Sequence, residues 1–144
     1  VREGALERDQ ANRLENLTTL CPTCHKKVEQ NVRIRSGLAG LGFVLGNLAP
    51  LFLMCDPRDL GIHTDPVWKP ANNMPTVVLY DHVPAGIGFS QKLFEIHDEL
   101  IHRAYELVSE CECEDGCPSC VGPGGENGIG GKVETLEILK QLIK

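Results

Sequence analysis

The hydrophobic pattern is uneven along the chain, and its longest apolar stretch runs from Leu38 to Met54. Three glycines, Asn47 and Pro50 interrupt this stretch. A membrane-spanning helix needs about 20 predominantly apolar residues. The interruptions therefore favour a buried helix, or a pair of helices split near Pro50, over a transmembrane span. The opening third, residues 1–35, is polar or of mixed charge and predicts a helical or irregular lead-in around a Cys-x-x-Cys turn.

Shorter apolar runs predict a small sheet and two more helices. Residues 76–80, Thr-Val-Val-Leu-Tyr, have the β-branched composition of a buried strand, and residues 62–68 are expected to be extended. Apolar residues from 93 to 108 recur at helical spacing and predict one amphipathic helix of roughly twenty residues. After a glycine-rich loop, residues 133–143 predict a short closing helix.

Four cysteines lie within ten residues near the C-terminus. They are Cys111, Cys113, Cys117 and Cys120. Four thiols so close in sequence can converge on one tetrahedral metal ion, with Zn–S distances of about 2.3 Å, whereas two disulfides would strain such short loops. The surrounding Glu, Asp and Gly are not core residues, which favours a metal site over reduced, buried thiols. We therefore predict an α+β fold, a helix-rich single domain with a small β-sheet and a four-cysteine zinc knot.

The predicted site holds one structural Zn²⁺ with no free coordination position, so it would not activate water. Gly116 and Pro118 lie between the ligands, where tight turns are required. An iron–sulfur cluster accepts the same four cysteines and is the alternative.

Cys21 and Cys24 have the spacing of half a metal site. The other ligands could come from an upstream Cys-x-x-Cys, from His25 with a distant group, or from the C-terminal cysteines. The pair could also remain without metal. Cys55 stands alone beside an apolar run and is expected in the core.

Composition limits the classes of function. With 144 residues and 42% hydrophobic residues, the chain can form one domain with a core. A net charge of -6 argues against an isolated nucleic-acid-binding module. Seven cysteines, and a start without the apolar segment of a secretory signal, predict a reducing, cytoplasmic setting. Because the sequence does not begin with Met, we expect it to be a piece of a longer protein.

Residues 15–29 resemble the closing part of HNH endonucleases, with Asn16 and His25 at matching positions. That family cuts phosphodiesters with a metal ion and an earlier histidine as general base. No histidine precedes Cys21 here, so we interpret the resemblance as a zinc-knuckle likeness and expect no nuclease activity.

Other candidate sites are weak. The turn Pro84–Gly88 could hold an anion at a helix N-terminus, but it lacks the further glycine or Lys-Ser/Thr of nucleotide-binding loops, and close packing explains it better. Asp56, Asp59 and Asp81 could bind a metal, although aspartates more often cap turns. We expect Trp68 to be a packing residue and assign no histidine to catalysis.

Three runs together resemble the MrfA-like zinc-binding domain, the C-terminal module of superfamily two DEAD/DEAH-box helicases. They are Asn47–Gly61, Val78–Phe89 and Cys111–Pro123. The resemblance extends from about residue 35 onward and implies that the four clustered cysteines are the zinc ligands. It further implies an accessory domain that braces an ATP-dependent helicase motor and assists strand handling. Neither a phosphate-binding loop nor an acidic motor motif occurs here, so we expect no enzymatic activity from the chain itself.

On this basis the chain divides into a Cys-x-x-Cys-His lead-in, residues 1–35, and a zinc-binding helicase accessory domain, residues 36–144. The expected partners are the motor lobes of the same polypeptide and, through the full-length protein, DNA or RNA, with no membrane. The one basic cluster is Lys26, Lys27, Arg33 and Arg35, where we expect nucleic-acid contact. A protein-interaction zinc module and a truncated HNH-type nuclease segment are the alternatives.

Overall fold

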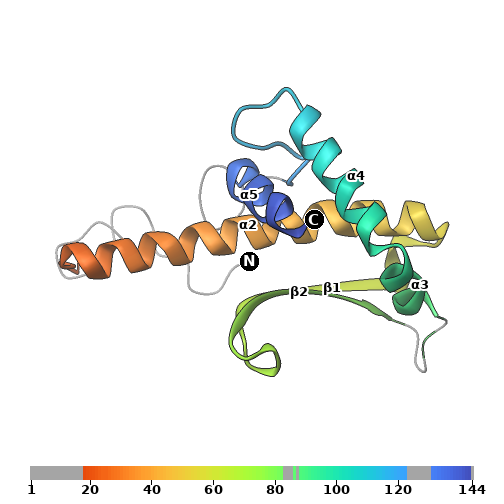
Figure 1. Ribbon diagram of the computed structural model, residues 1–144, viewed down its shortest axis with the longest axis horizontal. Helices are drawn as coiled ribbons and strands as arrows, with labels where there is room; N and C mark the ends of the chain where they lie inside the picture. Colours follow the sequence, from red (N-terminus) through yellow and green to blue (C-terminus); the bar gives the residue numbers. More distant parts are fainter. Residues whose placement is uncertain (1–17, 83–85, 87, 123–130, 144) are drawn as a thin grey trace, which may run out of the picture.

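The computed structural model describes residues 18–82, 86, 88–122 and 131–143 (Figure 1). Helix α2 (Pro22–Leu53) is the axis of the domain, and the strands and the other helices contact it. The hairpin of β1 (Leu60–Trp68) and β2 (Met74–Asp81) lies along one side of α2, and α4 (His97–Glu110) and α5 (Lys132–Leu142) lie along the other (Figure 1). The prediction of a helix-rich α+β domain with a small sheet is confirmed.

Helix α2 is one continuous helix of 32 residues, so the expected alternative of a helix pair split near Pro50 is wrong. Glycines weaken a helix by about 1 kcal/mol each relative to alanine, but here they lie where other elements approach closely. A Cβ on Gly40 would overlap the Thr135 hydroxyl of α5, and one on Gly46 would lie 2.6 Å from the Ile62 side chain of β1. Close packing on both sides therefore offsets the poor helix propensity of this segment.

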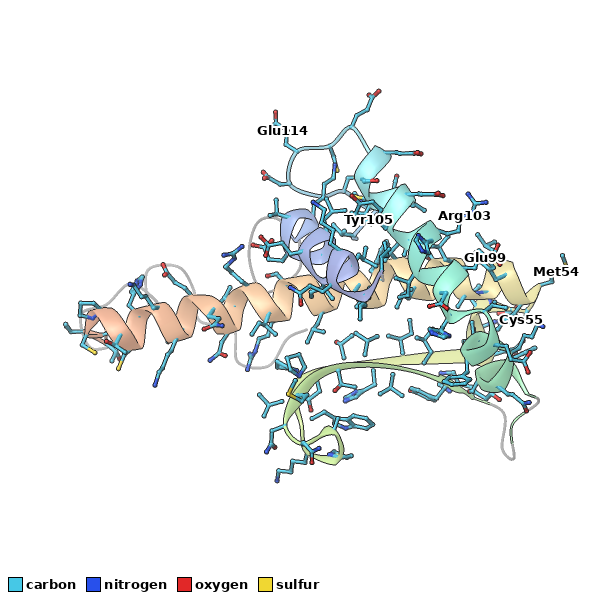
Figure 2. All side chains as sticks on the ribbon, viewed as in Figure 1. Met54, Cys55, Glu99, Arg103, Tyr105 and Glu114 are labelled. Atoms are coloured by element: carbon cyan, nitrogen blue, oxygen red, sulfur yellow. The ribbon has the colours of Figure 1, made fainter. Side chains whose placement is uncertain are left out.

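Pro50 lies inside α2, three residues before the helix ends at Leu53, and its missing N–H does not interrupt the helix. Met54 caps the helix in the left-handed conformation, with φ of 53°, and the backbone N–H of Cys55 donates to the Pro50 carbonyl at 3.1 Å. Figure 2 shows Met54 and Cys55 at this end of α2. Cys55 packs against the hydrophobic core from a half-buried position, as predicted.

The two halves of α2 differ in burial. Residues 18–32, named the arm here, are all exposed, and the arm projects beyond both the hairpin and α5 (Figure 1). By length and composition α2 could cross a membrane, since its most apolar window has a mean hydropathy of 1.6. However, 56% of that window is buried inside the fold, which is the position of a core helix.

The two strands form an antiparallel pair in which Ile62 opposes Leu79 and Thr64 opposes Val77. Both predicted extended segments are confirmed, and each strand is longer than expected. The expectation that residues 76–80 are buried is wrong, because every residue of β2 is half-buried or exposed. The pairing is irregular between Asp65 and Trp68. Pro66 lies there and has no N–H to donate, which is a common reason for such an irregularity.

The single helix predicted over residues 93–108 is wrong, because the structure has α3 (Phe89–Glu95) and α4 with a break at Ile96. The apolar periodicity continues through the break and conceals it. Asp98 and Glu99 occupy the first turn of α4, where acidic side chains favour a helix N-terminus. The predicted closing helix is confirmed as α5.

The core lies mainly where α2, α4 and α5 pack against one another. Its most buried hydrophobic side chains come from these elements and from the cysteine loop: Leu41, Val44, Leu45, Ala49, Leu100, Ala104, Val108, Cys120 and Leu139.

The predicted aspartate and glycine features have structural roles. Asp56 and Asp59 form the capping box of a short 3-10 helix (Pro57–Asp59). Asp81 accepts hydrogen bonds from the backbone N–H and the hydroxyl of Ser90, at 2.9 and 2.8 Å. The negative charge at the start of α3 is therefore the carboxylate of Asp81 itself. Residues 1–17, 83–85, 87 and 123–130 lie outside the described residues, and with them Asn16, most of the turn Pro84–Gly88 and most of the glycine-rich loop.

Candidate metal centre

The loop between α4 and α5 brings the four predicted cysteines together. Cys111 caps the C-terminus of α4. A tight turn then forms at Cys117-Pro-Ser-Cys120, where the Cys120 N–H donates to the Cys117 carbonyl at 3.0 Å. We call Cys111, Cys113, Cys117 and Cys120 the cysteine cluster. Among the described residues, it is the only group of three or more potential metal ligands whose ligand atoms lie within 4.8 Å of one another.

The sulfur positions match a tetrahedral zinc site. The Sγ–Sγ distances are 3.5 Å for Cys111–Cys113, 3.6 Å for Cys111–Cys117, 3.5 Å for Cys113–Cys120 and 3.7 Å for Cys117–Cys120. A tetrahedron with Zn–S bonds of 2.3 Å has S–S edges of about 3.8 Å. A disulfide would need sulfurs about 2 Å apart, and all seven cysteines are free thiols. The geometry therefore fits one metal ion with four sulfur ligands.

Local backbone geometry explains why this loop closes. Gly116 has φ of 123°, and a Cβ there would lie 2.5 Å from the Val121 side chain. Only glycine fits both conditions. Gly122 also has positive φ and packs against the ring of Phe43 on α2, which anchors the loop to the central helix.

The thiols of the cluster differ in their tendency to ionise. The backbone N–H of Ser119 stabilises a thiolate at Cys117 and lowers its pKa to about 7. Burial, reinforced by hydrogen bonding with Cys111, raises the pKa of Cys113 to about 12. Zinc binds thiolates, so metal binding must drive proton release from such a group.

Lys132, at the start of α5, is the functional residue that the sequence pattern did not reveal. Its side chain is only 8% exposed and donates to the carbonyl oxygens of Cys111 and Cys113, the latter at 2.6 Å. Its backbone N–H also donates to the Asp115 carbonyl at 3.2 Å. The ammonium group thereby joins α5 to the cluster and brings a positive charge near four sulfurs that become negative on binding zinc. A lysine at a helix N-terminus interacts unfavourably with the helix dipole. This unfavourable position was the signal in the sequence that could have indicated a special role for Lys132.

Cys21 and Cys24 lie at the tip of the arm, where both are exposed. The Cys24 N–H donates to Cys21 Sγ at 3.4 Å, and the neighbouring His25 pairs with Glu29 at 3.3 Å. The cluster contacts α2 near Phe43, nineteen residues further along the helix and thus roughly 30 Å away. The pair therefore does not share the C-terminal site, and its metal binding stays a prediction.

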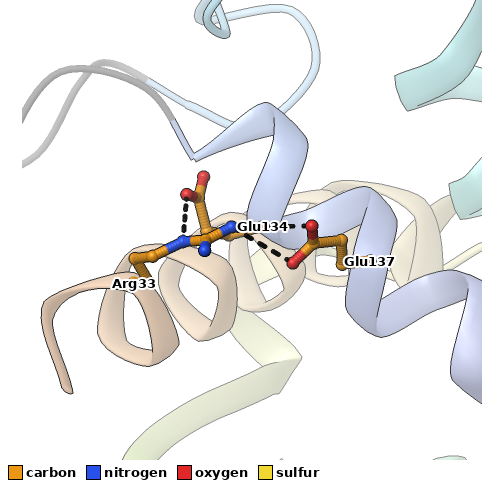
Figure 3. A network of polar contacts seen from close by, with 3 residues as sticks. All are labelled: Arg33, Glu134 and Glu137. Atoms are coloured by element: carbon orange, nitrogen blue, oxygen red, sulfur yellow. Dashed lines mark hydrogen bonds and ion pairs between the residues drawn. The ribbon is translucent and has the colours of Figure 1, made fainter. Parts of the chain in front are cut away.

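The four basic residues differ in availability. Arg33 pairs with Glu134 at 3.1 Å and with Glu137 at 3.4 Å, which ties α2 to α5 (Figure 3). Lys26, Lys27 and Arg35 are exposed. Nucleic-acid contact by this set stays a prediction, and a phosphate would have to compete with two carboxylates for Arg33.

Comparisons with known proteins agree with this geometry. The family described as the MrfA Zn-binding domain matches residues 41–121. The ATP-dependent helicase YprA of Bacillus subtilis is 39% identical over 106 residues, covering 73% of this chain and 14% of the helicase. A crystal structure of the DUF1998 helicase MrfA bound to DNA superposes with a TM-score of 0.67 at 35% identity, over 76% of this chain and 14% of that one.

A third relative shows that the module also occurs with little else attached. An uncharacterized protein of Methanocaldococcus jannaschii is 26% identical over 101 residues, which are 67% of this chain and 90% of the archaeal protein. By contrast, the chain spans only about one seventh of the length of the two helicases. The family match and the clustered thiols together support one structural zinc site. The HNH-like residues 15–29 lie outside the matched region.

Proposed function

Because the chain belongs to the MrfA Zn-binding domain family, we propose that it is the zinc-stabilised accessory domain of an ATP-dependent helicase, with the motor lobes in the same longer polypeptide. Residues 36–144 form the accessory domain in this proposal, and residues 1–35 form the lead-in. The observation that carries the proposal is the convergence of four thiols at tetrahedral spacing, at the C-terminal end of the matched region.

Cys111, Cys113, Cys117 and Cys120 are the proposed zinc ligands. A four-thiolate zinc has no open coordination position, so its role is mechanical rather than catalytic. The ion fixes the end of α4 against the start of α5, and the loop in turn packs on α2 through Gly122 and Phe43. A domain stabilised in this way can support the helicase motor lobes. It can also hold fixed the surface along which a nucleic-acid strand passes.

The test is to measure zinc content, ATPase rate and strand separation in the full-length helicase carrying Cys117→Ser and Cys120→Ser together. We expect one zinc equivalent to be lost and strand separation to fall more than the ATPase rate, because the motor sites lie elsewhere. Cys55→Ser is the matched control, since it removes a half-buried thiol away from the cluster. If the variant lacks the zinc but separates strands at the wild-type rate, the bracing role is contradicted.

We further propose that three exposed basic residues of α2, Lys26, Lys27 and Arg35, bind nucleic acid, with a smaller part for Arg33. The DNA held in the similar MrfA structure supports this proposal. Removing one basic side chain that pairs with a phosphate should reduce the slope of log affinity against log salt by about 0.9 on duplex DNA. Replacing the four residues by Gln in the full-length protein should therefore weaken binding and flatten its salt dependence. An unchanged slope would exclude them.

A further inference from the structure

A cleft of about 1130 Å³ lies beside β2, and we call it the β2 cleft. Its base is one face of α2, where Leu38, Leu41 and Leu45 follow one another at intervals of three and four residues. One wall is β2, and the other is formed by α4 and α5. Met74 of β2 and Leu142 of α5, both in the lining, are 61% and 48% exposed. The fold therefore leaves an apolar surface uncovered where the hairpin and the helices approach each other.

The β2 cleft follows the free edge of the strand. Consecutive residues of a strand point to opposite faces of the sheet, yet Thr76 and Val77 both line the cleft. A cavity that touches both faces must pass along the edge between them. Among the described residues the sheet has two strands, so β2 has no strand partner on this side.

The register shows which backbone groups this edge presents. The His82 N–H donates to the Asp59 carbonyl at 2.8 Å, in register with the pairing of the two strands. Hydrogen-bonded and non-hydrogen-bonded residues alternate along an antiparallel strand. Counting back from His82, Val77 and Leu79 therefore direct their N–H and C=O groups away from β1. Such an edge is a template for another strand.

The outer edge of β1 is less suited to pairing. The register of β1 is irregular between Asp65 and Trp68, and Pro66 lies within this irregularity. Both features are devices that protect a sheet edge from a further strand. In β2 the register is regular from Thr76 to Asp81. The edge that adjoins the cleft is thus also the regular one.

The length of the β2 cleft matches a short extended segment. Its lining residues on α2 run from Gln30 to Leu45, which is about 22 Å of helix. A strand of about seven residues covers the same length at 3.3 Å per residue.

The charges along the β2 cleft favour a basic partner. Glu134 and Glu137 of α5 and Asp98 of α4 line it. The one guanidinium in the lining, Arg33, pairs with both glutamates at 3.1 and 3.4 Å. This excess of carboxylates repels the phosphates of a nucleic acid and attracts lysine or arginine.

We propose that the β2 cleft binds an extended segment of a protein partner, about seven residues long, which pairs with β2 as a third strand. Alternate apolar side chains of this segment pack on Leu38, Leu41 and Leu45, and Lys or Arg at its ends lies near the carboxylates. In this mode of recognition the main-chain hydrogen bonds give affinity and the pockets for alternate side chains give specificity. The inference goes beyond the helicase role and does not depend on it.

The experiment measures amide hydrogen exchange by NMR on the 144-residue chain. The probe is a seven-residue peptide in which Val and Thr alternate between terminal lysines. In the free chain we expect the amides of Val77 and Leu79 to exchange fast, and those of Val78 and Tyr80, which bond to β1, to exchange slowly. Excess peptide should slow Val77 and Leu79 by at least about tenfold. Replacing the terminal lysines by glutamate should weaken binding about fivefold.

Two matched comparisons separate strand pairing from unspecific apolar contact. N-methylation at alternate peptide residues removes the donors of one edge, so one of the two methylated series should lose binding and the other should keep it. Glu137→Gln should weaken binding about twofold. The control is Glu106→Gln, an exposed glutamate that pairs with Arg103 on α4, outside the cleft, and it should have no effect.

Three results would overturn the proposal. The first is unchanged exchange at Val77 and Leu79 in excess peptide, and the second is equal binding by both methylated series. The third is slow exchange of these two amides in the free chain, because the edge would then already be covered by this chain or by a second copy. None of these results touches the zinc content or the ATPase rate, so they leave the proposed helicase role to its own test.

Discussion

The two halves of α2 belong to one helix yet have different surroundings. Its C-terminal half carries Leu41, Val44 and Ala49, which are at most 4% exposed, and it receives the sheet, α4, α5 and the cysteine loop. Its N-terminal half is the exposed arm. Each half is associated with one Cys-Pro-x-Cys turn, but only the turn beside the packed half has two further thiols nearby. The comparison teaches that a cysteine pair becomes a complete metal site only where the fold brings further ligands close to it.

The strongest way to sharpen this comparison is to remove one thiol from each turn. Cys120→Ser takes away a ligand that is 1% exposed and should abolish zinc binding at the cluster. We expect a loss of more than about 4 kcal/mol in the free energy of unfolding, or no cooperative unfolding at all. Cys24→Ser, in the exposed arm, should leave the unfolding of the domain nearly unchanged. Thermal denaturation followed by circular dichroism compares the two variants. Equal losses of stability would contradict the difference proposed between the two turns.

Lys132→Met should have the next largest effect. It retains much of the packing volume but deletes the hydrogen bonds from the ammonium group to two backbone carbonyls of the cluster. We expect a loss of about 3 kcal/mol in stability, together with weaker zinc retention in a chelator competition. The control is Lys140→Met, which changes an exposed lysine of the same helix. If both variants lose zinc at the same rate, Lys132 does not support the site.

Gly40→Ala tests the close contact between α2 and α5. The added methyl group would meet the Thr135 hydroxyl, and Thr135 is fully buried and cannot swing away. Overpacking of this kind costs about 1 to 3 kcal/mol. The matched change in the arm, Asn31→Ala, should be neutral or slightly stabilising because alanine is the better helix former. Urea denaturation measures both, and a stabilised Gly40→Ala would show that the helices separate easily.

The smallest expected effect is a difference in thiol reactivity between the cysteines at the two ends of α2. It does not involve the stability of the fold. Hydrogen bonding from the Cys24 N–H lowers the pKa of Cys21, whereas burial, and then the negative charge of Asp59, raises the pKa of Cys55. Near pH 7 more of Cys21 is thiolate, so with the arm free of metal Cys21 should be alkylated faster than Cys55. The difference should shrink as the pH rises past both pKa values. Mass spectrometry of the labelled peptides gives the two rates.

What the sequence could predict depended on the range of the interactions. The cysteine cluster spans ten residues, and its spacing, with Gly116 and Pro118 between the ligands, already contains most of the geometry. The unbroken course of α2 was not predictable from local signals, because Gly40 and Gly46 act through contacts with α5 and β1. The same holds for Lys132, whose partners Cys111 and Cys113 lie some twenty residues earlier.

The break at Ile96 was missed for the opposite reason. The apolar periodicity is a property of the face that packs on the core, and it persists through the change of direction. The acidic pair Asp98 and Glu99 marked the new N-terminus more locally. Signals for a helix N-terminus should therefore carry more weight than periodicity when a long amphipathic segment is divided into helices.

Because α2 is one unbroken helix, a change of its orientation at one end is transmitted to the other end. Cys24 lies roughly 30 Å from the point where Phe43 meets the cysteine loop, and no hinge separates them. A tilt of only about 10° at the packed end would carry the tip through about 5 Å. A slight change in how the loop packs on α2 would therefore move the tip of the arm by several ångströms.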